Sequence, residues 1–225
     1  MTTRSNALPA TLIEAIDGVA HLGTTTQKLV RDALERLWLD AAVRQPNGEV
    51  FILTGDIPAM WIRDSVWQVR PLLRFAHDPE IRDFVRGVIA AQAKFLNIDP
   101  YANAYNLEPN GNCWHKDFAD QSAWVFERKF ELDSITSFLQ LSLDLAEVTG
   151  DHSHLTADWW ALANRLVELL WTETEHDPKS YRFSRPGNPP HDYLSHDGYG
   201  APYRNCGLIW SAFRPSDDAC ELPFH

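Results

Sequence analysis

The chain has 225 residues, of which 44% are hydrophobic and 23% charged, and its formal net charge is −11. This balance is typical of a globular protein and excludes an intrinsically disordered chain. The negative charge argues against a nucleic-acid partner, because a chain this acidic offers no broad surface that could neutralise phosphates.

The first half of the chain is predicted to be helical with one extended interruption. Three threonines at 24–26 can cap a helix that continues to Ala41 with apolar residues at i, i+4 spacing. A turn signal at 45–48 (QPNG) precedes a short extended segment over 50–53. A second helix is expected to begin near Asp64. A third, opened by Asp78 and Pro79, is expected to continue to Leu96.

The second half alternates helices with long polar loops. Residues 97–114 are polar, aromatic and poor in helix formers, and 176–215 are rich in Pro, Gly, Asn and Tyr. Between them, 135–146 is apolar on nearly every side, as expected of an inner helix, and the stripe over 159–170 is its expected partner. Long loops in a compact domain are usually functional. We therefore expect the chemistry to lie where these loops converge, at one mouth of concentric rings of helices.

The first segment with residues suited to sugar chemistry spans 54–65. It brings together Asp56, Trp61, Arg63 and Asp64 just before a helix. A carboxylate can accept hydrogen bonds from neighbouring sugar hydroxyls, and a guanidinium donates a planar fork of hydrogen bonds. The alternative is structural, with Asp64 capping the helix and Arg63 paired to Asp56.

Two further segments are less specific. In 101–117, aromatic rings and amides suit hydroxyl recognition, but the same residue types are common in turns. In 126–134, charges of both signs alternate, which fits either the lining of a polar cleft or a solvated helix start with Asp133 as its N-cap.

The fourth segment, 207–220, contains adjacent carboxylates near an arginine and a tryptophan. An apolar wall and a like charge raise the pKa of one acid, while an arginine keeps the other ionised. A general acid that works at neutral pH requires such a raised pKa. The alternative is an Asx-capped turn that leads into another helix.

The three cysteines, Cys113, Cys206 and Cys220, form no CxxC pair and no Cys/His cluster with zinc spacing, so no metal site is expected. Their odd number favours reduced thiols in the cytoplasm. The first residues contain no long apolar run, so we expect neither an export signal nor a membrane span.

Taken together and in this order, the motifs TGDIPAMWIRDS, YANAYN, FERKFELDS and GLIWSAFRPSDDAC resemble glycoside hydrolase family 125. The resemblance covers most of the chain, from Thr54 to the end, and motifs of this length and number do not match by chance. It implies an exo-acting α-1,6-mannosidase with an all-α fold, the (α/α) six-hairpin toroid. It also implies no metal or other cofactor, and mannose-containing glycans as partners.

The resemblance further implies an inverting mechanism. One acid protonates the glycosidic oxygen, and a carboxylate roughly 6.5–9.5 Å away activates water. The acid is expected in the Asp217–Asp218 pair, with Asp218 preferred although the sequence does not separate the two. The terminal mannose is expected to be held by Asp56, Arg63 and Asp64, with Trp61 as a stacking wall. The looser candidates for the cleft lining are Tyr105, Asn106, His115, Glu127, Lys129, Asp133, Trp210 and Arg214.

Residues 1–225 are expected to form the N-terminal portion of a single toroid, about half of the ring. In the family the general base lies in the C-terminal half, so we predict that this polypeptide alone is inactive or nearly so. Three alternatives stay open: a fragment that binds mannosides without hydrolysing them, an inverting toroid glycosidase for another sugar, and a purely structural helical repeat protein. The last leaves the long polar-aromatic loops unexplained.

Overall fold

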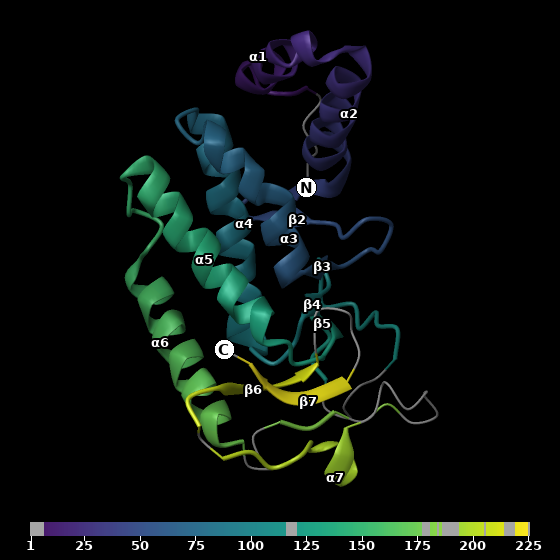
Figure 1. Cartoon of the computed structure of the whole chain (residues 1–225), viewed down its shortest axis with the longest axis vertical. Helices are drawn as coiled ribbons and strands as arrows, with labels where there is room; N and C mark the ends of the chain where they lie inside the picture. The colour runs from purple at the N-terminus through teal and green to yellow at the C-terminus, as the bar shows by residue number, and fades with distance from the viewer. Residues whose placement is uncertain are drawn as a thin grey trace.

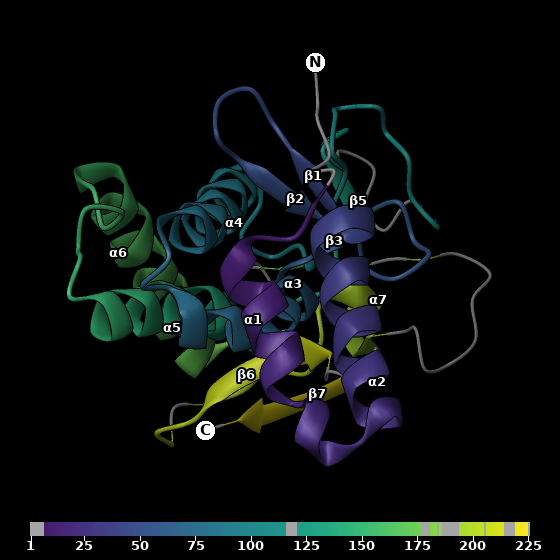
Figure 2. The same ribbon diagram turned by 90° about the horizontal axis from the view of Figure 1, so that it is seen from above.

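The computed structural model describes residues 7–115, 121–176, 181–183, 185, 194–204 and 206–213, and the backbone of 219–224. Helices form most of this part of the chain, and three small antiparallel sheets accompany them. Helix α3 lies against α5, and α4 lies against both α5 and α6 (Figures 1 and 2). The helices α1 and α2 lie at one end of this stack, and the β6–β7 hairpin lies at the other (Figure 1).

The N-terminal helices confirm the first predicted helix but not its cap. Helix α1 spans Ala10–Gly18, a 3-10 turn η1 spans Ala20–Leu22, and α2 spans Thr24–Glu35. A π-helical segment η2, Arg36–Ala41, continues α2. The N-cap of α2 is Gly23 rather than a threonine. Helix α2 contains no buried residue, and Leu29 is 64% exposed, so the predicted apolar stripe does not face the core at this position.

The extended segment predicted over 50–53 is confirmed as one strand of a hairpin. Strand β1, Ala42–Arg44, pairs antiparallel with β2, Val50–Ile52, across the predicted turn. The hairpin packs closely on α4 at Gly87. A Cβ atom at this position would lie 2.5 Å from the carbonyl oxygen of Gly48, so the contact requires a glycine.

The next two helices correct one predicted start and confirm another. Strand β3, Met60–Trp61, leads directly into α3, Ile62–Val69, and the 3-10 segment η3 spans Arg70–Phe75. The N-cap of α3 is Trp61, so Asp64 lies in the first turn instead of capping the helix. Helix α4 spans Pro79–Ile98, and the Asp78 carboxylate accepts a hydrogen bond from the Glu80 amide at 2.8 Å, as its capping role predicts.

A three-stranded sheet and two more helices follow. Strands β4, Ala104–Tyr105, and β5, Val125–Glu127, form a sheet with β3 in the order β3-β4-β5. The predicted inner helix is α5, Leu132–Thr149, and its N-cap is Glu131 rather than Asp133. Its expected partner is α6, Ala157–Thr172. The buried residues of α6 are Trp159, Leu162, Ala163 and Leu166.

The C-terminal segment corrects the prediction of a continuous loop. A 3-10 turn η4, Glu173–Glu175, and a single turn α7, Ser195–Gly198, in which His196 and Asp197 have positive φ, precede strand β6, Ile209–Phe213. Strand β7, Ala219–Phe224, pairs antiparallel with β6. The alternative of a turn that leads into a helix over 207–220 is therefore wrong, because 209–213 and 219–224 are strands.

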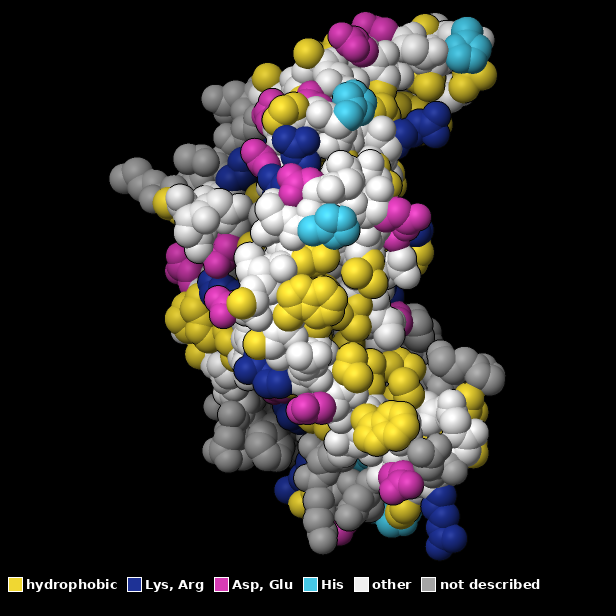
Figure 3. Space-filling view, turned by 90° about the vertical axis from the view of Figure 1, so that its left-hand side faces the viewer, with side chains coloured by type: hydrophobic (Ala, Val, Ile, Leu, Met, Phe, Trp, Pro, Cys, Tyr) yellow, Lys and Arg dark blue, Asp and Glu magenta, His cyan; other side chains and the backbone are white. Residues whose placement is uncertain are grey.

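The surface that α5 and α6 form carries exposed hydrophobic side chains (Figure 3). Three of them, Trp160, Val167 and Trp171, are spaced by seven and four residues along α6 and so lie on one line of the helix. In the part of the chain that the structure describes, no helix combines the length and hydrophobicity needed to cross a membrane.

Candidate active site

The β3-β4-β5 sheet brings together three of the segments that the sequence analysis singled out. Trp61 pairs with Ala104, and Ala104 pairs with Glu127. The Ile62 amide donates a hydrogen bond to the Asn103 carbonyl oxygen at 3.0 Å, which fixes the start of α3 beside this sheet. Residues near 61, 104 and 127 are therefore neighbours although they are far apart in the sequence.

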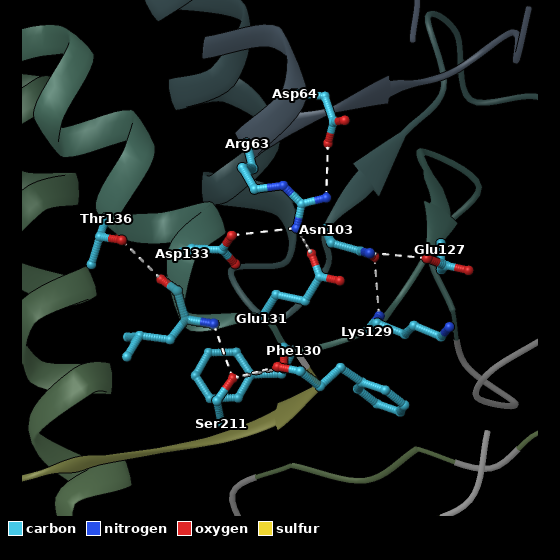
Figure 4. Close-up of polar contacts among 12 residues, drawn as sticks. Arg63, Asp64, Asn103, Glu127, Lys129, Phe130, Glu131, Asp133, Thr136 and Ser211 are labelled. Atoms are coloured by element: carbon cyan, nitrogen blue, oxygen red, sulfur yellow. Dashed lines mark hydrogen bonds and ion pairs between the residues drawn. The ribbon is translucent and has the colours of Figure 1, made fainter. Parts of the chain in front are cut away.

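Three carboxylates surround the guanidinium of Arg63 at this junction (Figure 4). Its Nη1 atom lies 3.3 Å from Glu131 Oε2 and 3.3 Å from Asp133 Oδ2, and its Nη2 atom lies 3.2 Å from Asp64 Oδ2. The Glu131 side chain is completely buried, whereas Asp64 and Asp133 remain about one-third exposed, at 35% and 30%. We call these four residues the Arg63 cluster.

The Arg63 cluster shifts the pKa values of its members in a way that follows from burial and charge. Burial by itself would lower the pKa of Arg63, but the three carboxylates together raise it, so the guanidinium stays charged. Burial raises the pKa of Asp133, and the attraction of Arg63 opposes that shift only in part. The cluster thus places three carboxyl groups around one fixed cation.

Glu127, the last residue of β5, belongs to a second polar network. Its carboxylate accepts hydrogen bonds from Asn103 Nδ2 at 2.9 Å and from Arg185 Nη2 at 3.1 Å. The Asn103 side-chain oxygen in turn accepts a hydrogen bond from the backbone amide of Lys129 at 3.1 Å (Figure 4). The Nζ atom of Lys129 lies 5.2 Å from the centre of the Phe213 ring. All of these side chains are buried, so in this chain the network supports the sheet from inside.

Two other predicted site residues, Tyr105 and Asn106, also serve the fold. The Tyr105 ring stacks on Phe95 with centroids 4.8 Å apart, and its hydroxyl donates to backbone carbonyls of the preceding loop. The side-chain amide of Asn106 donates hydrogen bonds to the carbonyl oxygens of Asn112 and Ala123 at 2.9 and 3.0 Å. Both side chains are fully buried.

The aromatic rings in this region differ in exposure. Trp61 is 6% exposed and packs against Phe126, with ring centroids 5.6 Å apart, and Trp210 is completely buried in β6. Trp114 is 56% exposed, and its ring also packs against Phe126, with ring centroids 5.5 Å apart. Its neighbour His115 is exposed as well. The sequence analysis favoured Trp61 as the stacking wall, whereas Trp114 presents the accessible indole.

Asp56 lies apart from the partners of Arg63. It is exposed on the turn after β2 and lines a cleft of about 820 Å³ between α2, η2 and η3. Most of the walls of this cleft are apolar, and they include Leu34, Leu37, Leu53 and Leu72. The ion pair between Arg63 and Asp56 that the structural alternative proposed is wrong, because Arg63 pairs with Asp64, Glu131 and Asp133.

Sequence reasoning missed Glu131, Asn103 and Arg185. Glu131 stands two residues before Asp133, and the alternation of carboxylates before an apolar helix was the signal that could have selected it. Arg185 lies in a loop without any pattern that marks it. The predicted residues Arg214, Asp217 and Asp218 lie outside the described residues, so their positions stay predictions. Within the described residues, no group of three His, Cys, Asp or Glu side chains could hold a metal ion.

Comparison with known proteins gives consistent matches. The family model for metal-independent α-mannosidases, GH125, matches residues 5–225. The meiotically up-regulated gene 157 protein of Schizosaccharomyces pombe is 38% identical over 197 residues, which are 79% of this chain and 39% of that protein.

A solved structure provides a match in three dimensions. It is a metal-independent α-mannosidase of Streptococcus pneumoniae in a non-productive complex with α-1,6-mannobiose. The TM-score is 0.87 at 34% identity, and the match covers 96% of this chain and 52% of that one. The fold is therefore that of the predicted toroid. The chain spans about half the length of the solved relative and less than half that of the yeast protein.

Proposed function

Because this chain belongs to the metal-independent α-mannosidases of glycoside hydrolase family 125, we propose that it forms part of an exo-acting enzyme that hydrolyses terminal, non-reducing α-1,6-linked mannose. The complex of the solved relative with α-1,6-mannobiose supports this choice of linkage. The residues that carry the proposal in this chain are those of the Arg63 cluster.

The Arg63 cluster is suited to hold a neutral sugar. Asp64 and Asp133 keep about one-third of their surface exposed, so each can accept hydrogen bonds from sugar hydroxyls. Arg63 donates charge-assisted hydrogen bonds to both of them and to the buried Glu131, which fixes their orientation. The single observation on which the proposal depends is this convergence of carboxylates on one arginine in a chain of this family.

The proposed reaction is a direct displacement with inversion. A carboxylic acid gives its proton to the glycosidic oxygen as the bond from that oxygen to the anomeric carbon breaks, and a carboxylate on the opposite face takes a proton from the attacking water. We assign the acid to the Asp217–Asp218 pair, in the connection between β6 and β7. The position of strand β6 supports this assignment. The Phe213 amide, at the end of β6, donates a hydrogen bond to the Phe130 carbonyl oxygen at 3.0 Å, so the strand ends beside Glu131 of the Arg63 cluster. We place the base in a part of the enzyme that these 225 residues do not include.

The test separates binding from turnover. We expect the 225-residue chain to bind α-1,6-mannobiose in calorimetry and to release no mannose above the uncatalysed background. The Arg63→Lys variant keeps the charge but loses the planar fork, so its affinity should fall by about tenfold or more, whereas the matched Arg70→Lys variant should bind like the wild type. Robust turnover by the chain alone would contradict the placement of the base. Equal affinities of the two variants would remove the Arg63 cluster from the site.

A further inference from the structure

A buried histidine lies between η4 and strand β6, and the proposed mechanism does not use it. The ring of His176 is held at both nitrogens: Nδ1 lies 2.5 Å from Glu173 Oε2, and Nε2 lies 2.8 Å from the carbonyl oxygen of Tyr199. The side chains of His176 and Glu173 are both completely buried. Because both groups are buried, the protons of the histidine and the glutamate must be placed so that the two groups hydrogen-bond to each other.

The two distances define that arrangement. A carbonyl oxygen only accepts hydrogen bonds, so Nε2 must carry a proton. A bare nitrogen lone pair would repel a carboxylate oxygen at 2.5 Å, so a second proton lies between Nδ1 and Glu173. The other carboxyl oxygen of Glu173 accepts a hydrogen bond from the Tyr101 hydroxyl at 2.7 Å. Nε2 is therefore a hydrogen-bond donor, and a second proton is shared between Nδ1 and Glu173.

The His176 ring is also stacked on an indole. The His176 and Trp210 rings are 3.5 Å apart and only 7° from parallel, and Trp210 is completely buried. Gly200 lies against the edge of the same indole, where a Cβ atom would come within 2.5 Å of Trp210 Cζ2. A cation on the face of a tryptophan is an attractive contact, and it strengthens when water is excluded. Trp210 is thus fixed in position by its neighbours.

The strand that carries Trp210 also contacts the Arg63 cluster. Ser211 Oγ accepts the Leu132 amide at 3.1 Å, and the Phe213 amide donates to the Phe130 carbonyl at 3.0 Å. Glu131 lies between these two anchored residues, and its carboxylate reaches Arg63. The contacts therefore connect His176 to Glu131 through β6.

We propose that His176, held doubly protonated by Glu173, is a positioning residue that fixes β6 through Trp210 and thereby sets Glu131 and Asp133 against Arg63. Its effect on a sugar ligand rests on the proposed function. Within the described residues, the titratable groups that contact the ring or its carboxyl partner include Glu173 from η4 and, beyond its carboxylate, the hydroxyl of Tyr101, while Tyr199 contributes its backbone carbonyl. Trp210 contributes an uncharged face.

The protonation state can be measured without any ligand. In a chain with ¹⁵N-labelled histidine, we expect the two ring nitrogens of His176 to show the chemical shifts of protonated nitrogens at neutral pH, with the signals assigned by their loss in His176→Phe. In Glu173→Gln the amide can donate to Nδ1, so one ring nitrogen should lose its proton while the hydrogen bond persists. A wild-type ring with only one protonated nitrogen would overturn the proposal.

The coupling to the Arg63 cluster needs a second measurement. His176→Phe keeps a ring against Trp210 but loses both hydrogen bonds. The matched control is His154→Phe, because His154 also contacts a backbone carbonyl, that of Ser142 at 2.8 Å, but lies in the connection between α5 and α6. We expect the Arg63 Nε–H resonance to move in His176→Phe and not in His154→Phe. An unmoved resonance in a folded His176→Phe chain would overturn the coupling.

Binding then distinguishes this proposal from the proposed function. The dissociation constant for α-1,6-mannobiose, measured on folded protein, should rise by about tenfold in His176→Phe, by less in Glu173→Gln, and by less than about twofold in His154→Phe. A purely structural role would reduce the folded fraction but leave the dissociation constant unchanged, and that result would contradict us. If the wild-type chain does not bind mannobiose, the proposed function fails, and the Arg63 resonance alone decides the role of His176.

Discussion

Two arginine–aspartate pairs connect α5 with α3 and the η3 segment that continues it, and the two pairs differ in their surroundings. Near the start of both helices, Arg63 lies 3.3 Å from Asp133 within a group of three carboxylates. Further along, Arg70 lies 2.8 Å from Asp144, and Arg70 is 41% exposed. The first arginine is 17% exposed, and its partner Glu131 is completely buried.

The difference shows what the fold requires and what it does not. One arginine and one carboxylate are enough to connect two helical segments, as Arg70 of η3 and Asp144 of α5 do. The buried Glu131 and the partly buried Asp133 beside Arg63 carry a desolvation cost that the Arg70 pair avoids. We propose that a ligand accounts for this costlier arrangement, and the predictions below compare the two pairs.

The largest effect is expected from Arg63→Met. This change removes the Arg63 cation from the buried Glu131, and removing one partner of a buried pair costs about 3–5 kcal/mol. Unfolding in urea, followed by circular dichroism, measures the loss of free energy. A second change, Glu131→Gln, should restore part of the stability when added to Arg63→Met. If it restores nothing, the buried charge is not the cause.

An intermediate effect is expected from Asp133→Asn, and it has the opposite sign. Burial raises the pKa of Asp133 in the folded chain. The folded state therefore holds this proton more tightly than the unfolded state does, and the wild type loses stability as the pH rises from the ordinary carboxyl range through the raised pKa. Asparagine never ionises, so the variant should be slightly more stable at neutral pH, by less than about 1 kcal/mol.

The pH dependence and the ligand provide the checks on Asp133→Asn. The stability difference between variant and wild type should vanish in acid, below the ordinary pKa of 3.8, where Asp133 is protonated in both states. The same variant should bind α-1,6-mannobiose more weakly, because an amide offers one acceptor oxygen instead of two. A variant that is less stable than the wild type at neutral pH would contradict this account.

The smallest effect is expected from Arg70→Met. The pair with Asp144 is partly exposed to solvent, and such pairs contribute about 0.2–1 kcal/mol. The same urea unfolding should show a loss in this range, and added salt should reduce it further. A loss as large as that of Arg63→Met would mean that the two pairs are equivalent, and the contrast between them would disappear.

The sequence predicted most of the helices because their signals are local. The Asp78 cap with Pro79, the apolar pattern of α5 and the stripe of α6 depend on residues a few positions apart. Strand β6 was missed because it depends on pairing with β7 and on contacts with 130–132, which no local pattern in 176–215 reveals.

The site was predicted in part for the same reason. Arg63, Asp64 and Asp133 were selected because each lies in a motif with mixed charges at a helix start. Their common contact with Glu131 depends on tertiary structure, and the sequence does not show that Glu131 is buried while Asp133 remains accessible. The burial of Trp61 and Trp210 depends equally on the packing of distant segments.

The low burial of helix α2 has a consequence for local unfolding of the chain. Because it buries no side chain completely, little free energy opposes its detachment from the rest of the chain. Its amide protons should exchange with solvent before those of α4 or α5. Trypsin should then cut first at Lys28 or Arg31, which are both exposed at the side chain, and the trimmed remainder would retain the packed helices intact.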